Sequence, residues 1–193
     1  MTRHHGGRLL RLPRHYYQGR AVVHWVQTEA NRATGWLSQS FHQEFRELMI
    51  HCAIQHHLVC PSYNLMPDHL HLIWMGLRQG SDQLNAMAFL RRHMKRAMAP
   101  YQLQKQAYEH VLRAHEREAG ALASTCFYIL NNPVRAGLVE APNDWPYHGA
   151  IIPGYPDWDP LDEKFWDRFW AMYEHRLDPR TFEGNDTEPN EPQ

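Results

Sequence analysis

The sequence predicts an α+β fold, a sandwich of helices packed on a mainly antiparallel sheet. The first observation is a β-hairpin, residues 58–66 and 69–75, that falls between two amphipathic helices at residues 40–57 and 81–99. The second is a further strand at residues 21–28, ahead of the first helix. The third is a globular composition, because 43% of the 193 residues are hydrophobic and 12% are aromatic. A chain of this length suits one main domain with a short terminal addition.

The first strand and the first helix follow from their side-chain patterns. Residues 21–28, AVVHWVQT, are rich in the β-branched and aromatic side chains that favour strands. Residues 40–57 repeat apolar side chains at helical spacing. Ser40 is the expected N-cap, with Gln43 three residues later as in a capping box. The apolar stripe of this helix consists of Phe41, Phe45, Leu48, Met49 and Cys52.

The hairpin has a clear turn and one irregular position. Pro67 and Asp68 separate its two strands and are typical of a tight turn. Pro61 lacks the backbone N–H that a neighbouring strand would bind, so we expect an exposed edge or a bulge there. The following helix, residues 81–99, is ended by Pro100. Its inward residues are Met87, Leu90, Met94 and Met98.

The rest of the chain predicts a short strand, two helices and a tail. Residues 108–112, YEHVL, form a candidate strand, and residues 116–132 form a helix that ends near Pro133. Residues 165–175 form an aromatic amphipathic helix, which we expect to dock on the body rather than to stack on nucleic-acid bases. Residues 178–193 are rich in Pro, Glu and Asn, so we expect them to be disordered.

The near-neutral net charge of −1 conceals an asymmetry. Residues 157–193 hold eleven acidic and four basic side chains, whereas residues 1–156 hold ten acidic and sixteen basic ones. Residues 1–20 contain five arginines and no acidic side chain. A basic body with an acidic tail is compatible with a nucleic-acid partner, although solvated surface charge explains it equally well.

The apolar runs and the cysteines place the chain among cytoplasmic proteins. No run approaches the roughly 18 apolar residues that span a bilayer, and the N-terminal MTRHHGGRLL lacks the apolar core of a signal peptide. We therefore expect no membrane partner. Three cysteines do not make a disulfide framework. A zinc cluster of Cys52, His56, His57 and Cys60 is conceivable but not expected, because its spacing fits no common zinc motif.

Two histidines interrupt the apolar strand MPDHLHLIW. Because side chains alternate along a strand, His69, His71 and Ile73 share one face, and the apolar residues between them share the other. Two neighbouring neutral imidazoles can bind one divalent ion if a third ligand comes from elsewhere. Alone, the pair is better explained as surface or hydrogen-bonded histidines. We expect Asp68 to serve the turn and to point away from His69.

A tyrosine and an asparagine lie one helical turn apart in the later helix. Tyr128 and Asn132 flank the core stripe of residues Leu122, Cys126 and Ile129, which lets them face a cleft. A tyrosine hydroxyl can attack phosphorus when a metal ion polarises the phosphoryl oxygens. An amide oxygen is a hard ligand that suits Mg²⁺ or Mn²⁺. The alternative is an ordinary surface tyrosine on an amphipathic helix.

These stretches together resemble a known family. LMPDHLHLIW, then YILNNPVRAGLVE and DWPYHGA, in this order, look like the single-tyrosine HUH transposases, in particular the REP-associated tyrosine transposases. The resemblance covers roughly residues 13–152. It divides the chain into a basic arm (1–20), an HUH-like catalytic domain (21–152), an aromatic helical extension (153–177) and the acidic tail.

The resemblance implies a fold, a chemistry and a site. The implied fold is ferredoxin-like. The implied activity is metal-dependent cleavage and strand transfer of single-stranded DNA, often near a hairpin, through a 5′-phosphotyrosine that frees a 3′-hydroxyl. Tyr128 would be the nucleophile, His69 and His71 the ligands of Mg²⁺ or Mn²⁺, and Asn132 the third ligand. The protein would act as a monomer or homodimer.

Basic side chains outside this chemistry are candidates for contacts with DNA phosphates. One group forms a ridge on the second helix, and the other belongs to the N-terminal arm. Arg135 and Trp145 are interpreted as structural residues. The ridge consists of Arg91, Arg92, Lys95 and Arg96, and the arm contributes Arg3, Arg8, Arg11 and Arg14. Two other functions stay open: a DNA-hairpin-binding protein without catalysis, and a small metal-dependent phosphoesterase.

Overall fold

The structure is a computed structural model that describes residues 11–177. Its strands are β1 (Val22–Thr28), β2 (Leu58–Leu65), β3 (His69–Gly76), β4 (Tyr108–Val111) and β5 (His148–Ile151). Its α-helices are α1 (Gln39–His56), α2 (Gln83–Ala97), α3 (Ala119–Leu130), α4 (Asn132–Arg135) and α5 (Phe165–Leu177). Its short 3₁₀ helices are η1 (Arg14–Tyr17), η2 (Ala114–Arg117) and η3 (Pro142–Asp144).

The strands form one antiparallel sheet with the order β4-β1-β3-β2-β5. The first six elements run β1-α1-β2-β3-α2-β4, and β1 and β3 lie at the centre of their four strands. This is the ferredoxin-like arrangement. The α+β fold class predicted from the sequence is confirmed, and β5 extends the sheet beside β2.

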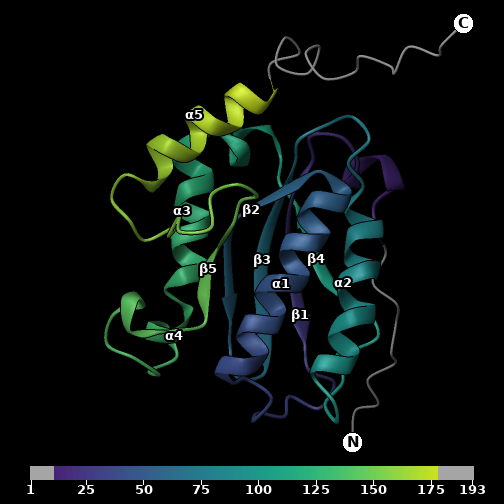
Figure 1. The fold of residues 1–193 in the computed structure, drawn as a ribbon, viewed down its shortest axis with the longest axis vertical. Helices are drawn as coiled ribbons and strands as arrows, with labels where there is room; N and C mark the ends of the chain where they lie inside the picture. Colours follow the sequence, from purple (N-terminus) through teal and green to yellow (C-terminus); the bar gives the residue numbers. More distant parts are fainter. Residues whose placement is uncertain (1–10, 178–193) are drawn as a thin grey trace, which may run out of the picture.

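Helices α1 and α2 lie side by side over one face of the sheet (Figure 1). Between them and the sheet lies a core that includes Trp25 from β1 and Trp74 from β3, both fully buried. The methionines predicted to face inward from α2 are all buried. Burial of such large apolar side chains stabilises the fold by about 1.5–3 kcal/mol each.

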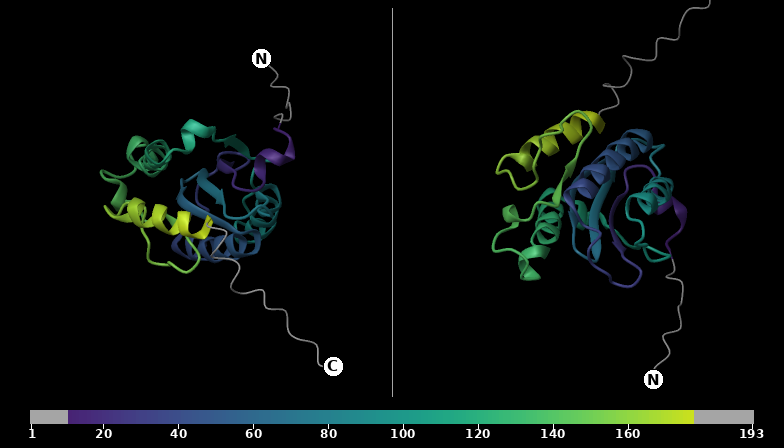
Figure 2. Two further views of the ribbon diagram at one scale, coloured as in Figure 1. Left: turned by 90° about the horizontal axis from the view of Figure 1, so that it is seen from above. Right: turned by 60° about the horizontal axis from the view of Figure 1, so that its bottom comes forward.

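Helices α3 and α5 cover part of the opposite face. Ile73 of β3 packs there with Cys126 and Ile129 of α3 and with Phe169 of α5. The Tyr173 hydroxyl of α5 donates a hydrogen bond to the backbone oxygen of Gly76 at 3.0 Å. The aromatic helix is therefore docked on the body, as the sequence predicted, and Figure 2 shows it on the same side of the sheet as α3.

Several element boundaries differ from the sequence prediction. Helix α1 begins two residues early, because Ser38, not Ser40, accepts the backbone N–H of Phe41 as the N-cap. The predicted helix over residues 116–132 is shorter and is followed by the separate turn α4. Strand β5 was not predicted as a strand.

Of the two features expected at Pro61, the structure shows a bulge and not an exposed edge. The pairing of β2 shifts register between Val59 and Ser62 on the β3 side and between Cys60 and Tyr63 on the β5 side. Since β2 is an interior strand, the missing N–H of Pro61 is accommodated by irregular pairing.

Two predictions concern segments outside the described residues. The disorder expected for residues 178–193 lies there, as do Arg3 and Arg8 of the basic arm. Within residues 11–177, no helix combines the length and the hydropathy needed to cross a membrane.

Gly76 ends β3 where no side chain fits. A Cβ atom at this position would overlap the backbone oxygen of Gly19. We expect Gly76→Ala to lower the free energy of unfolding by about 1–3 kcal/mol, because backbone must shift to admit the methyl group. Urea denaturation measures the change. Gly80→Ala is the control, since a Cβ there meets no atom within 4 Å; equal loss in both variants would contradict the steric explanation.

Candidate functional site

The two histidines of β3 lie on the sheet face that α1 and α2 leave free. His69 pairs with Thr28 of β1, and His71 pairs with Val26 of β1 and with Asn64 of β2. Their ring centroids are 4.8 Å apart. The intervening residue, Leu70, is fully buried in the core on the other face. The predicted separation of the two faces is therefore confirmed.

Each of these imidazoles is held at its Nδ1 atom. His69 Nδ1 lies 2.6 Å from Asp68 Oδ1, and His71 Nδ1 lies 3.0 Å from Nε2 of His24 on β1. Arg32 in turn donates to Asp68 Oδ2 at 2.9 Å. The expectation that Asp68 points away from His69 is wrong. Asp68 precedes the first residue of β3, so the strand alternation does not extend to it.

These hydrogen bonds constrain where the protons lie. A carboxylate only accepts, so neutral His69 donates from Nδ1 to Asp68 and keeps a free lone pair on Nε2. The bond between His71 and His24 holds one proton. When His71 donates it, His71 also keeps its lone pair on Nε2, and His24 carries its own proton on Nδ1. Both histidines of β3 then offer Nε2 as a ligand atom.

The surroundings keep the inner histidines neutral. Burial lowers the pKa of His71 to about 3, and repulsion from His24 and His69 in their charged forms adds to the effect. Burial, with repulsion from His110, lowers the pKa of His24 to about 4. Burial would raise the pKa of Asp68, but hydrogen bonds from His69 and Arg32 outweigh it and lower the pKa. At neutral pH the uncharged imidazoles of His71 and His24 therefore lie near the charged carboxylate of Asp68.

Asn64 is a site residue that sequence reasoning missed. It lies beside His71 on β2, is fully buried, and donates from Nδ2 to the backbone oxygen of Ile129 at 2.7 Å. Its Oδ1 atom has no hydrogen-bond partner among the described residues. An unsatisfied buried carbonyl costs about 1–3 kcal/mol, so a cation at this position would relieve it. Only the cross-strand register, which the sequence does not print, could have revealed Asn64.

Tyr128 and Asn132 are brought together by a third residue. Tyr128, near the end of α3, is 55% exposed. The Arg135 guanidinium lies over its ring at 4.2 Å, and Nη1 of Arg135 donates to Asn132 Oδ1 at 3.2 Å. The sequence predicted Asn132 on the same helix as Tyr128. In the structure, Asn132 instead begins the separate helix α4. Arg135, interpreted as structural from the sequence, therefore contacts both predicted site residues.

The structure brings the two halves of the predicted site to the same sheet face without joining them. Helix α3 packs on this face through Ile129, whose backbone oxygen binds Asn64. Among the described residues, no hydrogen bond or ring contact links Tyr128 or Asn132 to the histidines. Within residues 11–177, no three His, Cys, Asp or Glu side chains are grouped to hold a metal ion, and this covers the zinc cluster considered from the sequence.

The predicted basic ridge of α2 divides into two parts. Arg91 is committed to the fold, because its guanidinium donates to the Gln27 side chain and to the backbone oxygen of Gln104. Burial, with repulsion from Arg11, lowers its pKa. Arg92 and Lys95 line a cavity of about 280 Å³ together with Tyr101. Arg96 is exposed. Their contact with DNA stays a prediction.

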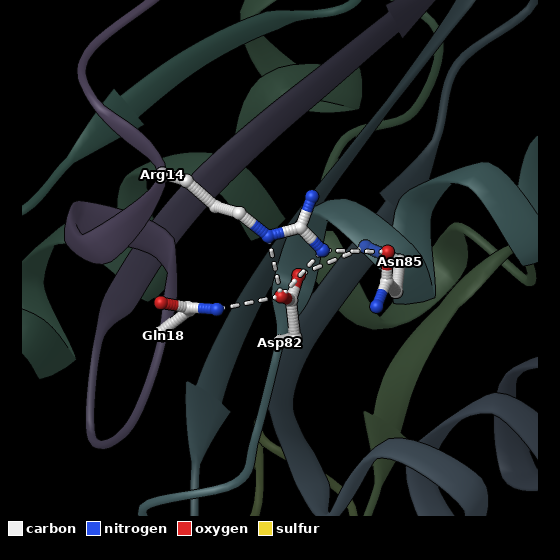
Figure 3. Close-up of polar contacts among 4 residues, drawn as sticks. All are labelled: Arg14, Gln18, Asp82 and Asn85. Atoms are coloured by element: carbon white, nitrogen blue, oxygen red, sulfur yellow. Dashed lines mark hydrogen bonds and ion pairs between the residues drawn. The ribbon is translucent and has the colours of Figure 1, made fainter.

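The two described arginines of the N-terminal arm bind the body of the protein. Arg11 forms an ion pair with Glu109 at 3.2 Å and lies over the Trp25 ring. Arg14 reaches Asp82 through two nitrogens, at 2.6 and 3.0 Å, and Figure 3 shows this contact with the neighbouring Gln18 and Asn85. The arm thus fixes the start of α2, and its contact with DNA stays a prediction.

Comparisons with known proteins support the fold. No model of a known protein family matches the chain, and no curated protein does. Several chains of solved structures match, and they include the following one. It is described as the REP-associated tyrosine transposase bound to a REP hairpin. The TM-score is 0.60 at 21% sequence identity, and the match covers 72% of this chain and 82% of that chain.

Asp82 gives the arm a pH-dependent anchor. Burial would raise its pKa, but hydrogen bonds from the Asn85 backbone, Gln18 and Arg14 outweigh it and lower the pKa. Because the pKa of Asp82 is lower in the folded protein, its charge stabilises the fold at pH values above about 3.9, the pKa of an unfolded Asp. This stabilisation is lost as the pH falls through the pKa of the folded state. We expect Asp82→Asn to cost about 1 kcal/mol at pH 7.

Comparing the stability of wild type and Asp82→Asn across pH tests this role of the Asp82 charge. Urea denaturation should show the gap between wild type and Asp82→Asn narrowing as pH falls below about 4. Asn retains the N-cap acceptor, so the change isolates the charge. A gap that stays constant from pH 7 to pH 3 would contradict the ion pair with Arg14.

Proposed function

We propose that the protein cuts and rejoins single-stranded DNA at hairpin-forming repeats, with Tyr128 as nucleophile and a divalent metal ion held by His69 and His71. The observation that carries the proposal is the paired histidine site. Two adjacent, partly buried imidazoles on the sheet face opposite α1 and α2 have Nδ1 engaged, and both keep Nε2 free when His71 donates to His24. The fold similarity to a tyrosine transposase bound to hairpin DNA supports the same substrate class.

The donor set fits Mg²⁺ or Mn²⁺. His69 and His71 would supply two nitrogens, and the remaining ligand would be an amide oxygen, a donor that these ions accept. Asn132 is the ligand that the resemblance implies, but its Oδ1 accepts from Arg135. The Oδ1 of Asn64 has no hydrogen-bond partner among residues 11–177, and Asn64 pairs with His71 across the sheet. Asn64 is therefore a second candidate for the oxygen ligand. A bound ion would polarise the phosphoryl oxygens of the scissile phosphodiester.

The chain's own residues would then carry the exchange of bonds. Tyr128 Oη forms a bond to phosphorus while the bond from phosphorus to the 3′-oxygen breaks, which leaves a 5′-phosphotyrosine and a 3′-hydroxyl. The phenol proton passes to solvent, to which Tyr128 is open, and the departing 3′-oxygen takes a proton from solvent. The Arg135 guanidinium lies over the ring at 4.2 Å, beside the attacking group. One phosphodiester replaces another, so rejoining requires no external energy source.

A second candidate is a protein that binds hairpin DNA without cutting it. The observation that favours it is the lack, among the described residues, of any contact between the Tyr128–Arg135–Asn132 group and the histidines. In the enzyme, the bound DNA would have to bridge the two groups. The following two experiments separate the candidates.

Covalent trapping tests the nucleophile. We expect wild-type protein, incubated with a labelled hairpin oligonucleotide and Mn²⁺, to form an adduct that survives a denaturing gel. Tyr128→Phe should form none, because the ring lacks the attacking oxygen. Tyr108→Phe is the control, since Tyr108 is equally exposed at 55%. An adduct in Tyr128→Phe would refute the assignment, and DNA binding without any wild-type adduct would favour the binder.

Metal affinity tests the role of His24. We expect His24→Ala to weaken Mn²⁺ binding about 10-fold or more, because His71 loses the partner that orients its ring and fixes its proton. Isothermal titration calorimetry of the DNA-free protein measures this without any activity. His110→Ala is the control: His110 faces His24 on β4 but bonds to Glu116 rather than to His71. Equal affinities in wild type and His24→Ala would remove His24 from the site.

A further inference from the structure

A basic cavity lies at the end of the sheet away from His69. It is formed where β1 begins and β4 ends, between η1 and η2, and its volume is about 530 Å³. This is within the range of roughly 300–1,000 Å³ for pockets that hold compounds the size of a nucleotide. Its polar lining includes Arg20, Arg113, Arg117 and His15, and among residues 11–177 no carboxylate lines it.

The guanidinium groups of this cavity are not paired with a carboxylate in the described part of the chain. Within residues 11–177, no ion pair involves Arg20, Arg113 or Arg117. Arg20 donates to the backbone oxygen of Leu177 at 3.0 Å, which satisfies one N–H without neutralising the guanidinium. Three guanidinium groups around one hollow repel one another, so the arrangement is stabilised by an anion that bridges them.

An aromatic ring adds a second kind of contact. Tyr16 lines the same cavity and is 47% exposed. Its ring lies 4.4 Å from that of His15, tilted by 34°. An exposed ring beside guanidinium groups is the combination that binds single-stranded nucleic acid, because the ring stacks on a base and the cations neutralise phosphates.

Hydrogen bonds and strand pairing connect the lining of the cavity to the histidines of the sheet. The Glu116 carboxylate in η2 binds His110 Nε2 at 2.8 Å and accepts the backbone N–H of Arg113 at 2.7 Å. His110 pairs across the sheet with His24, the partner of His71. Arg20 precedes His24 by four residues, about 13 Å of extended chain. A DNA strand leaving the histidines along this face would reach the cavity within a few nucleotides.

We propose that this cavity binds the single-stranded extension of the hairpin DNA, with phosphates on Arg113, Arg117 and Arg20 and a base stacked on Tyr16. The inference rests on the proposed function, because it names a second contact of the same substrate. It assigns the cavity to the unpaired strand and not to the stem, because a stacked base offers no free face to Tyr16 whereas an unpaired base does.

The salt dependence of binding tests the phosphate contacts. Fluorescence anisotropy without divalent metal measures affinity for a hairpin that carries a single-stranded extension and for the same hairpin without it. We expect Arg113→Ala/Arg117→Ala to reduce the slope of log K against log salt by about 1.4 on the extended hairpin, since each single-strand phosphate contact contributes about 0.7. On the blunt hairpin the variant should match wild type.

A charge-matched double variant controls for the loss of net charge. Lys164 and Arg168 are exposed and lie near the start of α5, away from the cavity lining. Lys164→Ala/Arg168→Ala should leave the slope unchanged. An unchanged slope in Arg113→Ala/Arg117→Ala, or an equal decrease in slope on the blunt hairpin, would overturn the inference. The proposed function would stand in that case, provided that wild type binds the DNA and forms the adduct. Failure of wild type to bind either DNA would overturn both.

The stacking contact has its own matched pair. Tyr16→Ala should weaken binding of the extended hairpin by about 5-fold or more, the effect of one stacked base, while Tyr16→Phe should bind like wild type because it retains the ring. Equal losses in the two variants would show that the hydroxyl, not the ring, is required and would overturn the stacking assignment. Thermal melting of each variant verifies that the fold is retained.

Discussion

Strand β3 is hydrogen-bonded on both sides, to β1 and to β2, and this position constrains the rest of the molecule. Its alternating side chains must serve two faces at once. Leu70, Leu72 and Trp74 enter the core beneath α1 and α2, where all three are fully buried. The same alternation places His69 and His71 on the other face. A shift of one residue would put imidazoles in the apolar core and leucines in the open, so the register is fixed strongly.

Placing imidazoles on a largely covered face has a cost, which neighbouring residues offset. Burial disfavours their charged forms, and a neutral ring still carries one donor and one acceptor that need partners. Asp68 and His24 meet this need at Nδ1 on the two rings. When His71 donates to His24, both rings retain Nε2 for a ligand outside the protein. The hydrogen bonds that satisfy these histidines in the fold also fix the orientation of their rings.

The sequence predicted what local periodicity encodes. The order of strands and helices, the two faces of β3 and the docking face of the C-terminal aromatic helix all follow from spacings within one element. Contacts between elements were not predictable. His24 and Asn64 become site residues only through the pairing of β1 and β2 with β3. Strand β5 was missed because four residues, HGAI, carry little pattern and pair with a strand about 85 positions earlier.

The helix ends were the other source of error. Tyr128 and Asn132 have the spacing of one helical turn, but α3 stops at Leu130, before Pro133. Arg135 then folds back to contact both residues, a contact that depends on the new direction of α4. Sequence spacing alone could not supply this arrangement, because it assumed a continuous helix.

The fold distinguishes basic side chains that are engaged within the protein from those that line the cavity. Arg11, Arg14 and Arg91 are engaged within the protein, by carboxylates, an aromatic ring or amide oxygens. Arg113 and Arg117 surround a hollow with no carboxylate in its lining. A net charge of −1 therefore does not argue against a nucleic-acid partner, because eleven of the acidic side chains belong to residues 157–193. What an approaching phosphate meets is the local field, and around this cavity that field is positive.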